Sequence, residues 1–289
     1  MNDTLTPPPA APAPGATPSA PDQTAAGGRR PGKAVAIIAT VAGGLVLLGT
    51  VTHAAVGTVR DAMRVSGSWT ADARGVTSLD VEAAGSRFAL EFGDVDEAVL
   101  EVDNARDGDW RIERDGSELV VRKADQLFGD WGFGREGETV VLTLPERLRG
   151  AALDADLHLA AGELRADAVF GELTLDLGSG AMDVTGTARS LDAEVSAGQI
   201  ELDLADVAAA ELTASAGRIV GDLTGDAPDT VAIDVSAGSV ELGMPRATYD
   251  VRSDVAAGSF DNRLDTSSSA PRQVTVDVSA GRVQLTPAD

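Results

Sequence analysis

The residues that could do chemistry are two histidines and a recurring serine. His53 lies in an apolar run, and His158 lies between two leucines, where alternation turns it outward. The recurring serines, each inside a Val-Ser-Ala-Gly phrase, are Ser196, Ser236 and Ser279. A serine nucleophile needs an activating base, and no histidine or lysine stands at a fixed offset from these serines. We therefore expect no catalysis, and a small turn residue at each serine.

Two acidic stretches invite a calcium hypothesis. Residues 103–109 lack the alternate-residue ligands of an EF-hand loop, because Ala105 occupies the third position. Asp222, Asp226 and Asp229 are clustered, but the repeated Gly-Gly-x-Gly-x-Asp phrase of calcium β-rolls is absent from the sequence. With no cysteine and no glycine-rich phosphate loop ending in Lys-Ser/Thr, we expect neither a metal nor a cofactor, and solvated turns at the aspartates.

Charge and composition narrow the class of partner. The 289-residue chain has a formal net charge of −23, and residues 58–289 carry 20 basic against 44 acidic side chains. Such a surface repels phosphate backbones, so we expect no nucleic-acid binding. Aromatic residues are only 3% of the chain. A core of Ala, Val and Leu fills only a thin architecture, because small side chains cannot fill the middle of a wide one.

A short phrase with a glycine at its centre recurs from Leu153 onward. The marker glycines are Gly162, Gly180, Gly198, Gly217, Gly238, Gly258 and Gly281. Their spacings are 18, 18, 19, 21, 20 and 23 residues, and a period near 20 indicates a solenoid. The residues three before and two after each marker glycine are apolar in all seven copies. Alternation on both sides predicts two short strands per coil, each with one face inward.

The predicted fold is therefore all-β: a parallel β-solenoid or β-helix-like domain of about seven coils, preceded by an N-terminal hairpin region that ends at Pro145. The glycine provides a bend, or a place where stacked backbones come too close for a Cβ. Equivalent corners are expected about 4.8 Å apart. Gly85 resembles a marker glycine, but its apolar neighbours are out of register by one, so it counts only as a possible first coil.

The N-terminal part divides by composition. Residues 1–33 form a Pro- and Ala-rich tail that we expect to be disordered and cytoplasmic, or alternatively to offer a proline ligand to a partner domain. Residues 34–57 hold no Asp, Glu, Lys or Arg, and the run is long enough to cross the ~30 Å hydrocarbon core as one transmembrane helix. Residues 58–68 form a juxtamembrane linker, and residues 69–289 an extracytoplasmic β-repeat domain.

Basic residues flank the apolar run on its N-terminal side at Arg29, Arg30 and Lys33. They place the tail in the cytoplasm and the rest of the chain outside, in a single-pass protein of the plasma membrane. The alternative is a cleaved signal peptide with a small-x-small site at residues 52–54. Both interpretations export the β-repeat domain.

One segment of the exported part is rich in aromatic residues. Residues 125–137 contain Leu127, Phe128, Trp131 and Phe133, interleaved with glycines. If exposed, they form an apolar patch of the kind that contacts a partner. The alternative is a cap that folds over an open strand edge.

The phrase Val-x-Val-Ser-Ala-Gly-x-Val-x-Leu, preceded by a hairpin region closed by Val140-Val-Leu-Thr-Leu-Pro145, resembles the bacterial putative-adhesin β-strand-repeat family. The resemblance covers about residues 75–287 and implies an extracytoplasmic domain tethered to the envelope, without catalytic residues. We expect a binding or structural, adhesin-like role toward an envelope polymer or protein. The alternatives are a regulatory membrane protein that senses envelope stress, and an enzyme acting on envelope polysaccharide with clustered carboxylates, although the acids here are dispersed.

Overall fold

The computed structural model describes residues 65–105, 110–123 and 138–288, all of which belong to the unit Val59–Asp289. Buried apolar and exposed polar residues alternate along their strands; in β11 (Thr230–Val235) the buried positions are Val231, Ile233 and Val235. Aliphatic side chains at every second position favour an extended chain with one buried face. The described residues are accordingly all-β, apart from a 3-10 turn at Glu146–Leu148.

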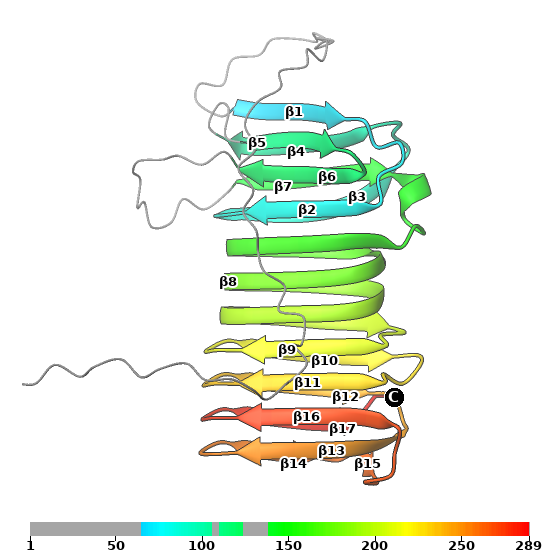
Figure 1. Cartoon of the computed structure of the whole chain (residues 1–289). Coiled ribbons are helices and arrows are strands. Elements are labelled where there is room, and N and C mark those ends of the chain that lie inside the picture. Colours follow the sequence, from blue (N-terminus) through cyan, green and yellow to red (C-terminus); the bar gives the residue numbers. More distant parts are fainter. Residues whose placement is uncertain (1–64, 106–109, 124–137, 289) are drawn as a thin grey trace, which may run out of the picture. The chain divides into compact units, whose positions relative to one another are not determined.

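The 17 strands of the described residues form one sheet that folds back on itself, so that two faces enclose the core (Figure 1). One face holds β5 (Trp110–Asp115), β6 (Glu118–Lys123), β2 (Ser78–Ala83), β9 (Ala209–Ala214), β11, β16 (Arg272–Val278), β13 (Thr248–Val255) and β15 (Asp265–Thr266). The other holds β1 (Val65–Ala71), β4 (Ala98–Ala105), β7 (Thr139–Pro145), β3 (Ser86–Gly93), β10 (Arg218–Thr224), β12 (Ser239–Met244), β17 (Arg282–Pro287) and β14 (Ser259–Asn262). Strand β8 (Leu153–Ala205) winds through the corners at Gly162, Gly180 and Gly198, and so contributes to both faces.

Neighbouring coils stack with equivalent residues side by side. Ile219 of β10 lies between Ile200 of β8 and Val240 of β12 in a parallel ladder. Strand β11 likewise lies beside β9, with Ile233 opposite Leu212. Apolar side chains from successive coils therefore form continuous rows in the core. The alternation within each strand is enough to specify which side chains join these rows.

The last two coils are stacked in the reverse of their sequence order. Strand β16 pairs with β11 on one side and β13 on the other, and β17 lies between β12 and β14. The buried positions of β16 and β17 are all apolar, whereas the end coil has Ser253 and Asn262 opposite the buried Val276 and Leu285. Placing the more apolar coil inside and the more polar one at the end buries more apolar surface.

A similar insertion occurs at the other end of the described stack. Strands β2 and β3 form a coil that lies between β8 and the pair β6 and β7. Beyond this pair, β4 runs antiparallel to β7, β1 antiparallel to β4, and β5 antiparallel to β6. The link from β5 to β6 is a tight turn at Gly116, which has φ +61°, and such short links join antiparallel neighbours.

These pairings correct the predicted architecture. A parallel solenoid of about seven coils preceded by a hairpin region is wrong: strands β1 to β7 belong to the same sheet as the coils, and this sheet is large and mixed. The physical reason is that an edge strand accepts a neighbour in either direction, and the short link from β5 to β6 requires the antiparallel one. The architecture also included a transmembrane helix. Among the described residues no helix is long and apolar enough to cross a membrane; the expected span 34–57 and the tail 1–33 lie outside them.

The core is built from Ala, Val and Leu, as the composition predicts. Six of the seven residues three before a marker glycine are buried, and so are six of the seven that follow by two. The exceptions are Val255 and Phe260, both in the end coil of β13 and β14. Two large side chains are fully buried near the ends of the stack, Trp110 in β5 and Tyr249 in β13. Strand β1 begins at Val65, within the segment expected to be a linker.

Candidate functional site

The marker glycines form a column along one corner of the coils. A Cβ added to Gly198 would come 2.6 Å from the carbonyl oxygen of Gly180, and one added to Gly217 would come 2.8 Å from that of Gly198. Gly281 contacts Gly238, and Gly258 contacts Gly281, so the column follows the spatial order of the coils. The close approach of stacked backbones excludes a side chain here.

Ser86 occupies the glycine position in the coil of β2 and β3, one residue after Gly85, the possible first-coil glycine. Ser86 is the register partner of Gly162, and a Cβ on Gly162 would meet the Ser86 carbonyl oxygen. Ala83 stands three residues before Ser86 and Phe88 two after it, and both are buried. With Ser86 in place of Gly85 as the marker position, the residues three before and two after it are again apolar. The hydroxyl of Ser86 is buried and makes no hydrogen bond within the described part of the chain.

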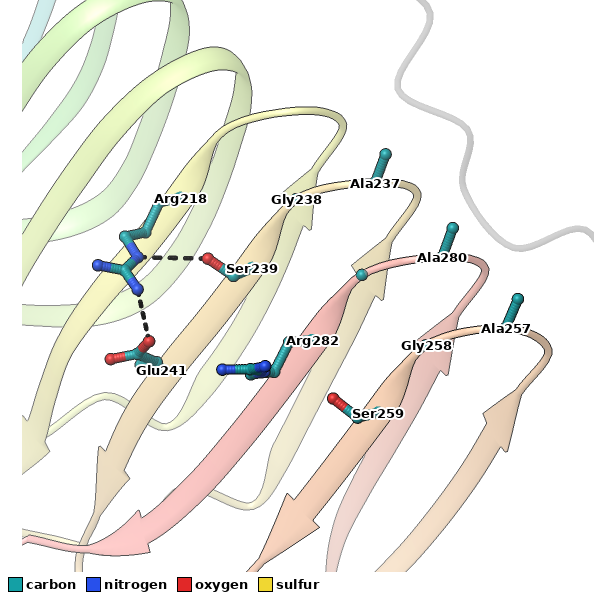
Figure 2. Close-up of a pocket in the computed structure, with 11 residues that line it drawn as sticks. Arg218, Ala237, Gly238, Ser239, Glu241, Ala257, Gly258, Ser259, Ala280 and Arg282 are labelled. Carbon is teal, nitrogen blue, oxygen red and sulfur yellow. Dashed lines mark hydrogen bonds and ion pairs between the residues drawn. The ribbon is translucent and has the colours of Figure 1, made fainter.

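An open trough of about 440 Å³ runs along this corner across β10, β12, β17 and β14 (Figure 2). One side is formed by the Ala-Gly corners of three coils, and the other by the residues that directly follow the marker glycines. The polar lining residues are Arg218, Ser239, Glu241, Ser259 and Arg282. Small corner residues keep the trough open, because longer side chains there would fill it.

The residues after the glycines alternate between arginine and serine across the strands. Arg218 is opposite Ser239, Ser239 is opposite Arg282, and Arg282 is opposite Ser259. At about 4.8 Å per strand, the Cα atoms of Arg218 and Arg282 lie roughly 10 Å apart. The order depends on the reversed coils, since in the sequence Ser259 precedes Arg282. This site was not among the predicted ones, although the sequence carries a signal for it: six of the seven marker glycines are followed by a polar residue.

The two guanidinium groups differ in their contacts. Arg218 donates from Nη2 to Glu241 Oε1 at 2.7 Å and from Nε to Ser239 Oγ at 3.3 Å. Arg282 is exposed and, within the described residues, forms neither an ion pair nor a side-chain hydrogen bond. Figure 2 shows Arg282 between the strands that carry Ser239 and Ser259. Its donors are therefore available to an acceptor entering the trough.

The predicted serine and histidine positions lie on the surface. Ser196, Ser236 and Ser279 are exposed at the corners. The amide of Ser279 donates to the Val235 carbonyl at 2.9 Å, as a stacked corner requires. His158 lies on the outer face with its Nδ1 3.1 Å from Asp176 Oδ2, and its side chain is 44% exposed. None of these serines lies in the trough.

The outer face that contains β2 and β8 is acidic. Asp80 and Asp156 are register partners on neighbouring strands. Burial raises the pKa of Asp80 to about 6, with smaller contributions from the charges of Glu82, Asp156 and Glu118, while Arg122 opposes them. Burial also raises the pKa of Asp156 and of Asp192. Among the described residues no group of three or more acidic or histidine side chains could hold a metal ion. In the acidic stretch that contains Asp226, the Asp226 amide donates to Asp206 Oδ1 at 3.1 Å.

The aromatic segment lies outside the described residues. Leu127, Phe128, Trp131 and Phe133 all belong to 124–137, so their predicted partner contact stays a prediction. The residues at the base of this segment are described. Lys123 Nζ lies 2.5 Å from Glu138 Oε2, and the buried Trp110 donates from Nε1 to Glu138 Oε1 at 2.6 Å. Since the Arg87 amide donates to the Glu138 carbonyl at 2.9 Å, Glu138 lies beside Ser86, at the corner of the coil formed by β2 and β3.

Comparison of the fold identifies related architectures. A crystal structure of a putative adhesin from Bacteroides fragilis matches with a TM-score of 0.52 and 13% identity, over 78% of this chain and 98% of that one. This chain has an adhesin-like fold. A putative cell adhesion protein from Clostridium sporogenes matches with a TM-score of 0.37 and 8% identity, over 78% of this chain and 100% of that one. No family model matches the chain, and no curated protein matches it either.

Proposed function

We propose that this chain is a non-catalytic binding protein of the cell envelope, whose adhesin-like domain holds acidic groups of an envelope polysaccharide in the trough at Arg282. The observation that carries the proposal is an exposed guanidinium without a side-chain partner among the described residues, set between two serine-bearing strands. A binding or structural role also agrees with the adhesin-like fold.

The chemistry of the trough favours carboxylate groups on a long polymer. A planar guanidinium binds a carboxylate through two parallel hydrogen bonds, and neighbouring hydroxyls add further donors. No aromatic side chain is among the lining residues, so sugar rings have no stacking platform there. Each contact is therefore weak, and a polymer that carries repeated carboxylates gains affinity by engaging several copies of the protein at once.

The arrangement of nucleophiles supports binding over catalysis. The corner serines are exposed, and the backbone amides of Ser236 and Ser279 donate to carbonyls of neighbouring coils. Ser239 accepts a hydrogen bond from Arg218 and has Glu241 nearby, but a guanidinium cannot act as the base that a serine nucleophile needs. A hydrolytic role would need paired carboxylates at a fixed separation, and the trough lining holds only Glu241.

Binding of the full chain to polygalacturonate, measured by biolayer interferometry, tests the proposal. We expect measurable binding that weakens with added salt, and no binding to the fully methyl-esterified polymer. Arg282→Gln is expected to weaken binding at least about tenfold, because a hydrogen bond to a charged group contributes about 1.5–3 kcal/mol. Arg263→Gln is the matched control, since Arg263 is exposed, lies outside the trough and pairs with Asp261 at 2.8 Å.

Two results would contradict the proposal: equal binding of the esterified polymer, or equal loss of binding in both arginine variants. The proposed location has its own test. Protease treatment of intact cells is expected to digest the adhesin-like domain, and protection of the domain until the cells are lysed would exclude display at the surface.

A further inference from the structure

The end coil formed by β13 and β14 has an open edge. On one side β13 pairs with β16 over Tyr249–Val255, and on the other only Thr248 and Tyr249 pair with β15. No strand of the described residues pairs with the outer side of Val251–Val255. Figure 1 shows β13 and β14 as the last coil of the stack. A strand in this position presents a row of backbone donors and acceptors to another chain.

The backbone hydrogen bonds identify which residues direct their polar groups outward. The amide of Ala256 donates to the Val278 carbonyl on β16, and the Tyr249 carbonyl accepts from Ser267 on the opposite side. Backbone groups of alternate residues in a strand point to opposite sides. Val251, Ser253 and Val255 therefore direct both their amide and their carbonyl groups away from β16, into the open edge.

The core-facing side chains of this coil are incompletely covered. Val255 is 37% exposed and is the single exposed large hydrophobic residue of the described part of the chain, whereas Val278, its neighbour on β16, is 3% exposed. Phe260 of β14 is only partly buried, while Val283 beside it on β17 is fully buried. The end coil thus lacks the neighbour that covers every inner coil.

We propose that this open edge is the interface of a two-fold symmetric dimer, in which β13 pairs antiparallel with β13 of a second copy about Ser253. In this register Val251 faces the partner subunit's Val255, and Ser253 faces the partner subunit's Ser253. All three are residues whose backbone groups point outward, so each facing pair exchanges two hydrogen bonds. The exposed valine is then covered by a valine.

The charges of β13 agree with this register and favour a second copy of the same chain. Pairing about Ser253 places Arg252 opposite the partner subunit's Asp254, and the symmetry makes this contact twice. Pairing about Arg252 would place two arginines opposite each other, which is unfavourable. Arg252 pairs with Asp250 at 2.6 Å in its own chain, while Asp254 forms no ion pair within the described residues. Asp254 is therefore free to accept the partner subunit's Arg252.

A cysteine placed at the symmetry axis tests the arrangement directly. The chain has no cysteine, so Ser253→Cys introduces one thiol that faces itself only in the proposed register. Facing residues of a hydrogen-bonded antiparallel pair have Cα atoms about 5.5 Å apart, within the range of a disulfide. We expect the full-length variant to form a covalent dimer when copper–phenanthroline oxidises the thiols, and Ser236→Cys, at the exposed corner of an inner coil, to remain monomeric.

Charge exchange provides a second measurement that does not depend on a new bond. Sedimentation velocity of the full chain over a range of concentrations is expected to show reversible dimers. Asp254→Arg is expected to weaken the dimer at least about tenfold, because like charges across an interface are costly. Adding Arg252→Asp to Asp254→Arg restores opposite charges across the axis and is expected to recover dimers. Asp277→Arg is the matched control, since Asp277 lies beside Asp254 on β16, one strand from the edge.

The proposal is overturned if the chain is monomeric at every concentration, or if Asp254→Arg and Asp277→Arg change dimerisation equally. It is also overturned if Ser253→Cys and Ser236→Cys cross-link to the same extent. Circular dichroism and thermal unfolding of each variant establish that a loss of dimers is not a loss of fold.

Discussion

Gly281 stacks on Gly238, although Gly258 lies between them in the sequence. A Cβ added to Gly281 would collide with the carbonyl oxygen of Gly238 and with Cγ1 of Val235. These atoms belong to a neighbouring backbone and to a β-branched core residue, so neither can move without separating the coils. The contact joins coils that are consecutive in space, and it fixes the place of the C-terminal coil in the stack.

Gly281→Ala is therefore expected to lower the free energy of unfolding by about 2–3 kcal/mol, as overpacking of a tight core does. Urea denaturation of the full chain measures the change. Gly150→Ala is the control, because nothing lies within 4 Å of a Cβ added there; it is expected to change stability by less than about 0.5 kcal/mol. Equal effects of the two substitutions would refute the close-approach explanation of the glycine column.

The sequence predicts which side chains of each coil face the core, but not the order in which the coils stack. Apolar residues at fixed distances from the glycine, such as Val235 and Val240, specify which side chains face the core, and both are fully buried. Parallel coils with the same cross-section pair in the same register, whichever coil comes first along the chain. Strands β16 and β17 lie inside the stack because the coil of β13 and β14, which could take the same place, carries the polar residues Ser253 and Asn262. This difference shows only when whole coils are compared with each other.

The candidate site depends on this order. Arg282 is two strands from Arg218 because the last coils are reversed, so the alternation of arginine and serine is invisible along the sequence. Ser86 escapes prediction for another reason: a pattern defined by glycine does not include it, although Ala83 and Phe88 keep the apolar spacing around this serine. The antiparallel strands β1 and β4 carry no repeat phrase, and nothing in their alternation specifies direction.

Ser86→Ala is expected to raise the free energy of unfolding by about 1 kcal/mol. The hydroxyl of Ser86 is buried without a hydrogen-bond partner in the described structure, and an unsatisfied buried polar group costs roughly 1–3 kcal/mol. Alanine keeps the Cβ and removes only the hydroxyl. Thermal unfolding followed by circular dichroism gives the comparison, with Ser236→Ala at an exposed corner as control. A lower midpoint for Ser86→Ala than for the control would contradict the assignment.

Glu138→Ala is expected to lower the free energy of unfolding by about 1–3 kcal/mol, because it removes the acceptor of the Trp110 Nε1–H and the partner of Lys123 together. Glu138→Gln keeps an acceptor for the indole and loses only the ion pair, so its effect is expected to be smaller. Urea denaturation monitored by tryptophan fluorescence separates the two. If both variants lose the same stability, the hydrogen bond to Trp110 contributes nothing.

Asp80 makes stability depend on pH. Its carboxyl has a pKa of about 6 in the folded chain against 3.8 for an exposed aspartate. Since the folded state holds this proton more tightly than the unfolded chain, Asp80 lowers the free energy of unfolding progressively as the pH rises from about 4 to 6. Above that range the charged group remains close to the charges of Glu82, Asp156 and Glu118, which Arg122 offsets in part.

Asp80→Asn removes the charge and is expected to raise the free energy of unfolding at pH 7.5 by about 1 kcal/mol, an amount discounted because Asp80 is only partly buried. At pH 4, where the folded protein holds the proton and the unfolded chain holds it in part, the difference is expected to shrink toward zero. Urea denaturation at both values measures it, with Asp203→Asn at an exposed position as control. A gain of the same size at both pH values would mean that the charge of Asp80 is not its cause.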